Sequence, residues 1–199
     1  MAVAERQKFH PVKPMAQVIM ERWQGFEWTL QGLGMLRTYI TPELRMHVWD
    51  SRYMVEDVTM LHTHPWDFES LIVAGRVDQF RFLESPIALG PSWLAFVKGT
   101  IQCGAGGGEC APPANVWLEP QVMESYVEGD TYQQLANEIH ESMPVDGTVT
   151  LINRTFHEDT ETAHVFWPAG FQWVSAEPRP AEPVEVEDII SYSLETWFR

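Results

Sequence analysis

Hydrophobic and polar residues alternate over short stretches of the chain, which is the pattern of half-buried β-strands. The clearest case is 44–49, where Leu44, Met46 and Val48 alternate with three more polar or larger residues. Glycine, proline and Asp-Gly signals separate such stretches and indicate turns. Further strands are predicted at 33–39, 54–61, 77–83, 148–153 and 163–167. Many short strands with frequent turns predict an all-β barrel or sandwich.

Two segments instead show the 3–4 spacing of amphipathic helices, 15–31 and 185–198. Acidic residues crowd the first turn of the second segment, which suits a helix N-terminus. Between them, 84–125 is rich in proline and contains the glycine run 104–108, so it reads as an irregular insertion and a candidate lid. Within that insertion, 93–97 and 115–118 have the composition to pair as strands.

Length and composition are consistent with one soluble domain over 1–199, with an N-terminal extension (1–35), the insertion (84–125) and a C-terminal linker and helix (177–199). The net charge of −15 argues against general binding to nucleic acid. Residues 1–17 lack a secretory signal, and no stretch is apolar enough to cross a membrane, so we expect a cytoplasmic protein. Cys103 and Cys110 are expected to be free thiols; a local disulfide or a second metal site remains an alternative.

The strongest chemical signal is His62-Thr63-His64, followed by Asp67 and Glu69. On a strand, residues at i and i+2 share a face, so both imidazoles would point the same way. Neutral imidazoles, with or without one carboxylate, suit Fe(II), Mn, Ni, Zn or Cu. Asp67 and Glu69 have the opposite parity on a straight strand, and a bulge near Pro65 would be needed to turn either toward the histidines.

His62, His64, Glu69 and Gly75 have the spacing of the first motif of the cupin superfamily, which this stretch resembles. Over roughly 40–175 the chain more narrowly resembles uncharacterised cupin-like proteins of bacteriophages and bacteria that share a His-x-His-Pro-Trp-Asp-Phe core. Cupins take a further histidine from a later strand, and His140 is the candidate. Ile139-His140, a turn and a β-branched strand also look like the second motif of thiol dioxygenases. The Pro-x-Gly that precedes this histidine in typical cupins is absent.

This resemblance implies a cupin (double-stranded β-helix, or jelly-roll) barrel with short N- and C-terminal helices. It implies a divalent metal, most simply Fe(II), with Zn, Mn or Ni as alternatives, held by His62, His64 and His140. Glu69 is the candidate fourth ligand, and Asp67 is an alternative ligand or an acceptor behind the ligands.

The implied function is a metal-binding protein acting on a small molecule, as an Fe(II)-dependent dioxygenase. A non-catalytic protein that sequesters a small ligand or nucleotide, in the host cytoplasm if phage-encoded, is one alternative. A cupin isomerase or lyase is another. The family also suggests a homodimer.

The other charged residues near the motifs have ordinary explanations. We expect four histidines to be structural or superficial: His10, His47, His157 and His164. Four arginines near predicted strands are expected to be solvated, unless one of them binds an anionic group: Arg45, Arg76, Arg81 and Arg154.

Overall fold

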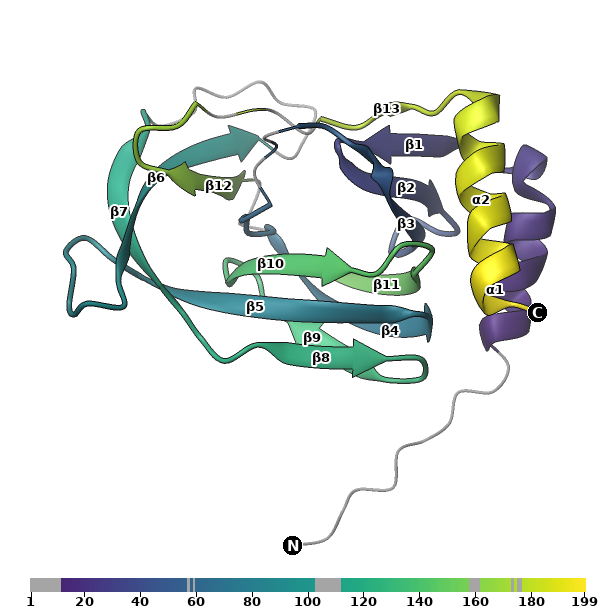
Figure 1. Ribbon diagram of the computed structural model, residues 1–199, viewed down its shortest axis with the longest axis horizontal. Helices are drawn as coiled ribbons and strands as arrows, with labels where there is room; N and C mark the ends of the chain where they lie inside the picture. Colours follow the sequence, from purple (N-terminus) through teal and green to yellow (C-terminus); the bar gives the residue numbers. More distant parts are fainter. Residues whose placement is uncertain are drawn as a thin grey trace, which may run out of the picture.

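A computed structural model shows a mostly β protein, with two antiparallel sheets and two helices packed side by side at one end (Figure 1). This fits the predicted all-β, barrel-like class. The structure describes residues 12–56, 58, 60–102, 112–157, 162–172, 174 and 177–199. Cys103, Cys110 and His10 lie outside these residues, as does the glycine run predicted as part of a lid.

Among the described residues, the first sheet has seven strands in the order β13-β1-β2-β3-β11-β4-β9. Its strands are β1 (Trp28–Gln31), β2 (Leu33–Tyr39), β3 (Leu44–Met54), β4 (Trp66–Ala74), β9 (Thr131–Gln134), β11 (Val149–Phe156) and β13 (Arg179–Pro180). The predicted strands at 33–39, 44–49 and 148–153 are therefore confirmed. Asp50 and Ser51, which have the composition of a turn, continue β3, where Asp50 is buried beside Arg52.

The second sheet has six strands in its described part, in the order β10-β5-β7-β6-β12, with β8 paired to β5. Its strands are β5 (Arg76–Ser85), β6 (Leu94–Gln102), β7 (Ala114–Pro120), β8 (Glu124–Val127), β10 (Ile139–Pro144) and β12 (Thr162–Pro168). Gly75, with a φ of +87°, turns β4 into β5; a Cβ there would lie 2.3 Å from the Thr148 hydroxyl oxygen. Both the backbone angle and this close approach favour glycine at the turn.

The region 84–125 is more regular than its composition indicates. β6 and β7 pair within it, with Leu94 opposite Leu118 and Val97 opposite Asn115. The expected pairing of 93–97 with 115–118 is confirmed, whereas the description of the whole region as irregular is wrong. Pro112 and Pro113 precede β7 and Pro120 is its last residue, so none of them interrupts the middle of the strand.

Helices α1 (Val12–Glu21) and α2 (Pro183–Trp197) cover one face of the first sheet (Figure 1). The C-terminal helix is confirmed, and its predicted apolar residues Val186, Ile189 and Ile190 are buried. The N-terminal helix is shorter than predicted, because a 3₁₀ turn (Trp23–Gly25) and β1 occupy the second half of 15–31. Among the described residues, no helix is both long and apolar enough to span a membrane.

The segment before β4 differs from the prediction in a way that shapes the site. The described residues of 55–61 form no strand, so the strand predicted at 54–61 is wrong beyond Met54. Instead, the backbone of His62 exchanges hydrogen bonds with His140 on β10, at 3.1 Å each way. On the other side, Thr63 donates to the carbonyl of His164 on β12 at 2.9 Å, and Phe166 donates to that of Leu61 at 3.0 Å. This short segment therefore bridges two edge strands of the second sheet.

Both faces of the first sheet are covered. Met46, Val48 and Leu151 pack against the helices in the main hydrophobic core. The alternate residues of β3, such as Arg45 and His47, are also buried and line a cavity on the opposite face of the sheet. The alternation along β3 thus separates a core face from a cavity face, and neither face is open to bulk water.

Candidate metal centre and its cavity

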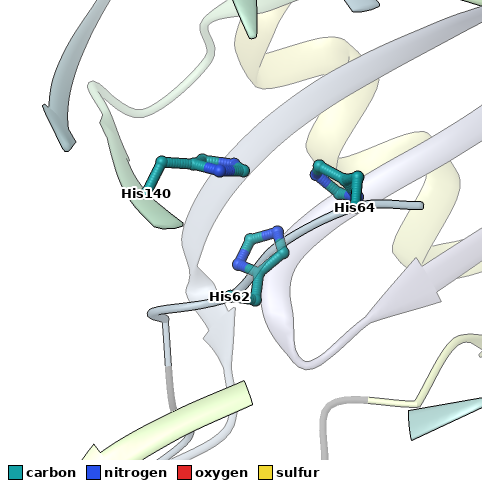
Figure 2. A group of neighbouring side chains, drawn as sticks. All are labelled: His62, His64 and His140. Atoms are coloured by element: carbon teal, nitrogen blue, oxygen red, sulfur yellow. The ribbon is translucent and has the colours of Figure 1, made fainter. Parts of the chain in front are cut away.

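Three histidine side chains converge in the structure: His62, His64 and His140 (Figure 2). One potential ligand atom from each lies within 4.8 Å of the others. The ring centroids are 4.7 Å apart for His62 and His64, 4.6 Å for His62 and His140, and 5.1 Å for His64 and His140. The predicted distant partner of the His-x-His pair is therefore beside it.

Backbone pairing explains why the rings meet. His62 and His140 face each other in the bridge between the pre-β4 segment and β10. The carbonyl of His64 then accepts a hydrogen bond from the amide of Asn137 at 2.9 Å, in the turn that leads into β10. Asn137 has a φ of +64°, the left-handed conformation that asparagine tolerates well. Two backbone contacts thus hold the two ligand-bearing segments together.

In two of the three rings, Nδ1 already has a backbone carbonyl oxygen as its hydrogen-bond partner. Nδ1 of His62 lies 2.7 Å from the carbonyl oxygen of Met60, and Nδ1 of His140 lies 3.3 Å from that of Glu138. If each Nδ1 carries the proton and donates it, Nε2 remains a free lone-pair donor. This arrangement, in which an acceptor behind each ring fixes the tautomer and the orientation, is typical of metal-binding histidines.

The protonation state also suits metal binding. Burial lowers the pKa of His62, and it holds the pKa of His64 and His140 well below the usual histidine value. Repulsion from neighbouring imidazoles lowers the pKa of His64 and His140 further. The three rings are therefore neutral at physiological pH, which is the ligating form. Three neutral nitrogen donors on one side of a cavity fit a divalent transition metal that keeps open positions.

The two carboxylates of the motif lie elsewhere. Glu69 is exposed on β4, between Gln133 of β9 and Asn153 of β11, and it does not belong to the histidine group. The structure thus gives no support to Glu69 as a fourth ligand. Its neighbour Phe68 is buried and lines the cavity, so the period-2 alternation of β4 directs Glu69 to the other face.

Asp67 has a structural contact rather than a place at the centre. Its carboxylate accepts a hydrogen bond from the amide of Ala136 at 2.6 Å and pairs with His157 at 3.0 Å. The Ala136 amide is the largest cause of the lowered pKa of Asp67, and His157 adds to it. The acceptors behind His62 and His140 are backbone carbonyls instead. Asp67 therefore anchors the 135–138 turn to the start of β4.

The histidines line one part of a cavity of about 560 Å³ between the sheets. Trp66 lies between the histidines and the remaining lining of the cavity. Its ring stacks on that of His64, with centroids 5.2 Å apart and an angle of 24° between the planes. Phe68, Tyr132 and Ile152 add apolar surface. A volume of this size accommodates a small organic molecule, and its mostly apolar wall with a few polar groups is typical of ligand sites.

The same cavity is also lined by charged residues that the sequence analysis expected to be solvated or superficial. Arg45 and Arg154 were expected to be solvated, yet they are only 5% and 9% exposed and line the cavity. His47, expected to be structural or superficial, is 3% exposed and lines it too. The signal available in the sequence was their shared parity on the predicted strands, which places Arg45 and His47 on one face.

The electrostatics of this part of the cavity are dominated by positive charge. Burial, followed by the charges of the nearby Arg37 and Arg154, lowers the pKa of Arg45 to about 10. Burial would raise the pKa of Tyr39, but the three guanidinium groups outweigh it and the pKa is lowered. Burial, followed by the same positive charges, holds the pKa of His47 well below the usual value.

No family model matches the chain, and no curated protein matches it. Membership of the cupin superfamily therefore stays a prediction that rests on the motif residues.

Proposed function

We propose that the protein is a metal-binding cupin that acts on a small molecule as an Fe(II)-dependent dioxygenase. The observation that carries this proposal is the convergence of His62, His64 and His140 at the wall of a 560 Å³ cavity. A bound Fe(II) would supply the redox and Lewis-acid chemistry that side chains lack.

The chain's own residues would hold and shield the reacting molecule. The three imidazoles would hold the metal at the wall of the cavity, where a small molecule would have access to it. Apolar residues such as Phe68 and Ile152 keep water away from the centre, which strengthens polar interactions there. His47 is buried and lines the same cavity, so its imidazole would be positioned to exchange a proton with the bound molecule.

Metal analysis of the full chain, purified without a histidine tag, tests the first half of the proposal. We expect about one transition metal ion per chain after loading with Fe(II), held by the histidine group found among the described residues. His62→Ala should abolish this content, and the matched His157→Ala should retain it. Negligible binding of every transition metal to the wild type, unchanged by His62→Ala, would refute the metal site.

Oxygen consumption tests the second half. The iron-loaded protein would be supplied with small thiols, keto acids and nucleotides in turn, and O₂ uptake would be compared with that of His62→Ala. Uptake that depends on both substrate and His62 supports the dioxygenase. Tight binding of one of these molecules without turnover would favour a sequestering protein, and proton exchange without O₂ uptake would favour an isomerase or lyase.

A further inference from the structure

Arginines from three neighbouring strands form one wall of the cavity. Arg37 of β2, Arg45 of β3 and Arg154 of β11 all line it. The strand register explains this convergence: Tyr39 pairs with Arg45, and Arg45 pairs with Ile152, two residues before Arg154 on the same face. We use the term arginine wall for Arg37, Arg45 and Arg154.

The side chains of Arg45 and Arg154 interact with the hydroxyl of Tyr39, but their guanidinium groups have few other partners. The Nε atoms of Arg45 and Arg154 are fully buried and have no hydrogen-bond acceptor. Arg154 donates through Nη2 to the carbonyl of Pro42, and Arg37 donates through Nε to the hydroxyl of Thr29. In the part of the chain that the structure describes, no salt bridge involves the arginine wall.

Further donors on the same side of the cavity are also unpaired. The indole N–H groups of Trp49 and Trp66 and the hydroxyl of Thr150 are buried without a partner, and both ring nitrogens of His47 lack one. Most of these groups donate hydrogen bonds. A set of convergent donors with no acceptor is complementary to a ligand that brings acceptors.

This charge pattern is opposite to that of the whole chain, which has 28 acidic and 13 basic residues. Burying a guanidinium without a carboxylate costs free energy, which an anionic ligand would offset. Arginine in addition matches the two oxygens of a carboxylate or phosphate with its planar fork of N–H groups.

The arginine wall lies next to the metal centre. The guanidinium carbons of Arg45 and Arg154 lie 5.6 and 5.1 Å from the Trp66 ring centroid. His64 stacks on that same ring, at 5.2 Å between centroids. A single aromatic side chain therefore separates the arginine wall from the histidines. A small organic molecule is long enough to reach from one group to the other.

We propose that Arg45 and Arg154 bind the carboxylate or phosphate of a small organic acid, whose other end reaches His62, His64 and His140. The placement of that other end rests on the metal-dependent function proposed above, whereas the anion site stands by itself. Arg37 adds positive charge at the edge of this site.

Calorimetric titration of the metal-free full chain tests the anion site. Metal would be removed by chelation and dialysis, and the probes would be malonate, inorganic phosphate and the neutral analogue malonamide. We expect saturable binding of malonate or phosphate and none of malonamide; the comparison of malonate with phosphate identifies the preferred anion. Arg45→Gln and Arg154→Gln should each weaken this binding by about 10- to 100-fold, the range for a hydrogen bond to a charged group.

The matched control is Arg76→Gln, because Arg76 is an exposed arginine that pairs with Asp78 outside the cavity. It should leave anion affinity unchanged. If Arg45→Gln does not fold, as judged by circular dichroism, Arg154→Gln decides the question, since Arg154 is less deeply buried. No binding of either anion to the wild type, or equal affinity in the folded arginine variants, overturns the anion site.

Two further measurements separate this proposal from the metal-dependent function. His62→Ala should lose metal but keep anion binding in the metal-free state, whereas Arg154→Gln should keep metal content and lose anion affinity. Anion binding that appears only with metal, and survives Arg154→Gln, would mean that the anion binds the metal and that the arginine wall has another role.

Discussion

Replacement of His140 by alanine should lower metal affinity by about 100-fold. A zinc site with four protein ligands contributes about 10–16 kcal/mol of binding free energy, which corresponds to about 2.5–4 kcal/mol for each ligand. The space in the cavity beside His140 allows a water molecule to replace the lost imidazole, so the loss should lie in the lower half of this range, at about 3 kcal/mol. At about 1.4 kcal/mol per factor of ten, this is a loss of about 100-fold.

Competition between the protein and a chromophoric chelator for Zn²⁺ would measure this change without redox chemistry. The His157→Ala variant is the control, because His157 pairs with Asp67 and lies outside the histidine group. Urea denaturation of each metal-free variant would show that the fold is retained. Zn²⁺ affinities of wild type and His140→Ala that agree within about threefold, less than 1 kcal/mol, would refute the assignment of His140 as a ligand.

Three further predictions concern stability. Burial holds the pKa of His47 well below that of an unfolded chain, so below pH 6.5 the unfolded state binds a proton that the folded state does not. The metal-free protein should therefore lose about 1 kcal/mol through this residue between pH 6.5 and 5.5, and in His47→Leu the urea midpoint should fall less over that interval. Gly147→Ala should lower the free energy of unfolding more than Gly129→Ala does. We expect the difference between the two variants, measured by urea unfolding, to be about 1–2 kcal/mol. Both glycines have a positive φ, but only at Gly147 would the new Cβ lie 3.0 Å from Trp197 Nε1; equal losses would show that this contact relaxes. Ser193→Ala should lower the melting temperature and the free energy of unfolding, the latter by about 1–2 kcal/mol. The substitution leaves the buried carbonyl of Gly147 without the 2.7 Å hydrogen bond from the serine hydroxyl. An unchanged melting temperature would mean that another donor replaces the hydroxyl.

The sequence predicted much of the fold because local patterns carry it. The alternation over 44–49 places two sets of side chains on opposite faces whatever the sheet packs against. The apolar spacing of Val186, Ile189 and Ile190 likewise specifies which face of α2 is buried. The ends of the predicted elements were less accurate. Composition alone did not distinguish a long helix over 15–31 from a short helix followed by a strand.

The candidate site was predictable in part. His62 and His64 are two residues apart, so local geometry alone brings them near each other. The choice of His140 came from the family resemblance, and strand pairing between distant segments is what places it beside them. The position of Glu69 also depends on tertiary structure: the strand begins only at Trp66, and its alternation sends Phe68 inward and Glu69 outward.

The sequence by itself thus determined the β class, the C-terminal helix and the proximity of the two imidazoles of the His-x-His pair. Only the tertiary structure decided that the polar face of β3 is enclosed. Alternation distinguishes two faces, but it does not say whether the more polar face meets bulk water or a second sheet. Because the second sheet lies across the cavity, Arg45, His47 and Arg154 become buried groups that line the same cavity as the three histidines.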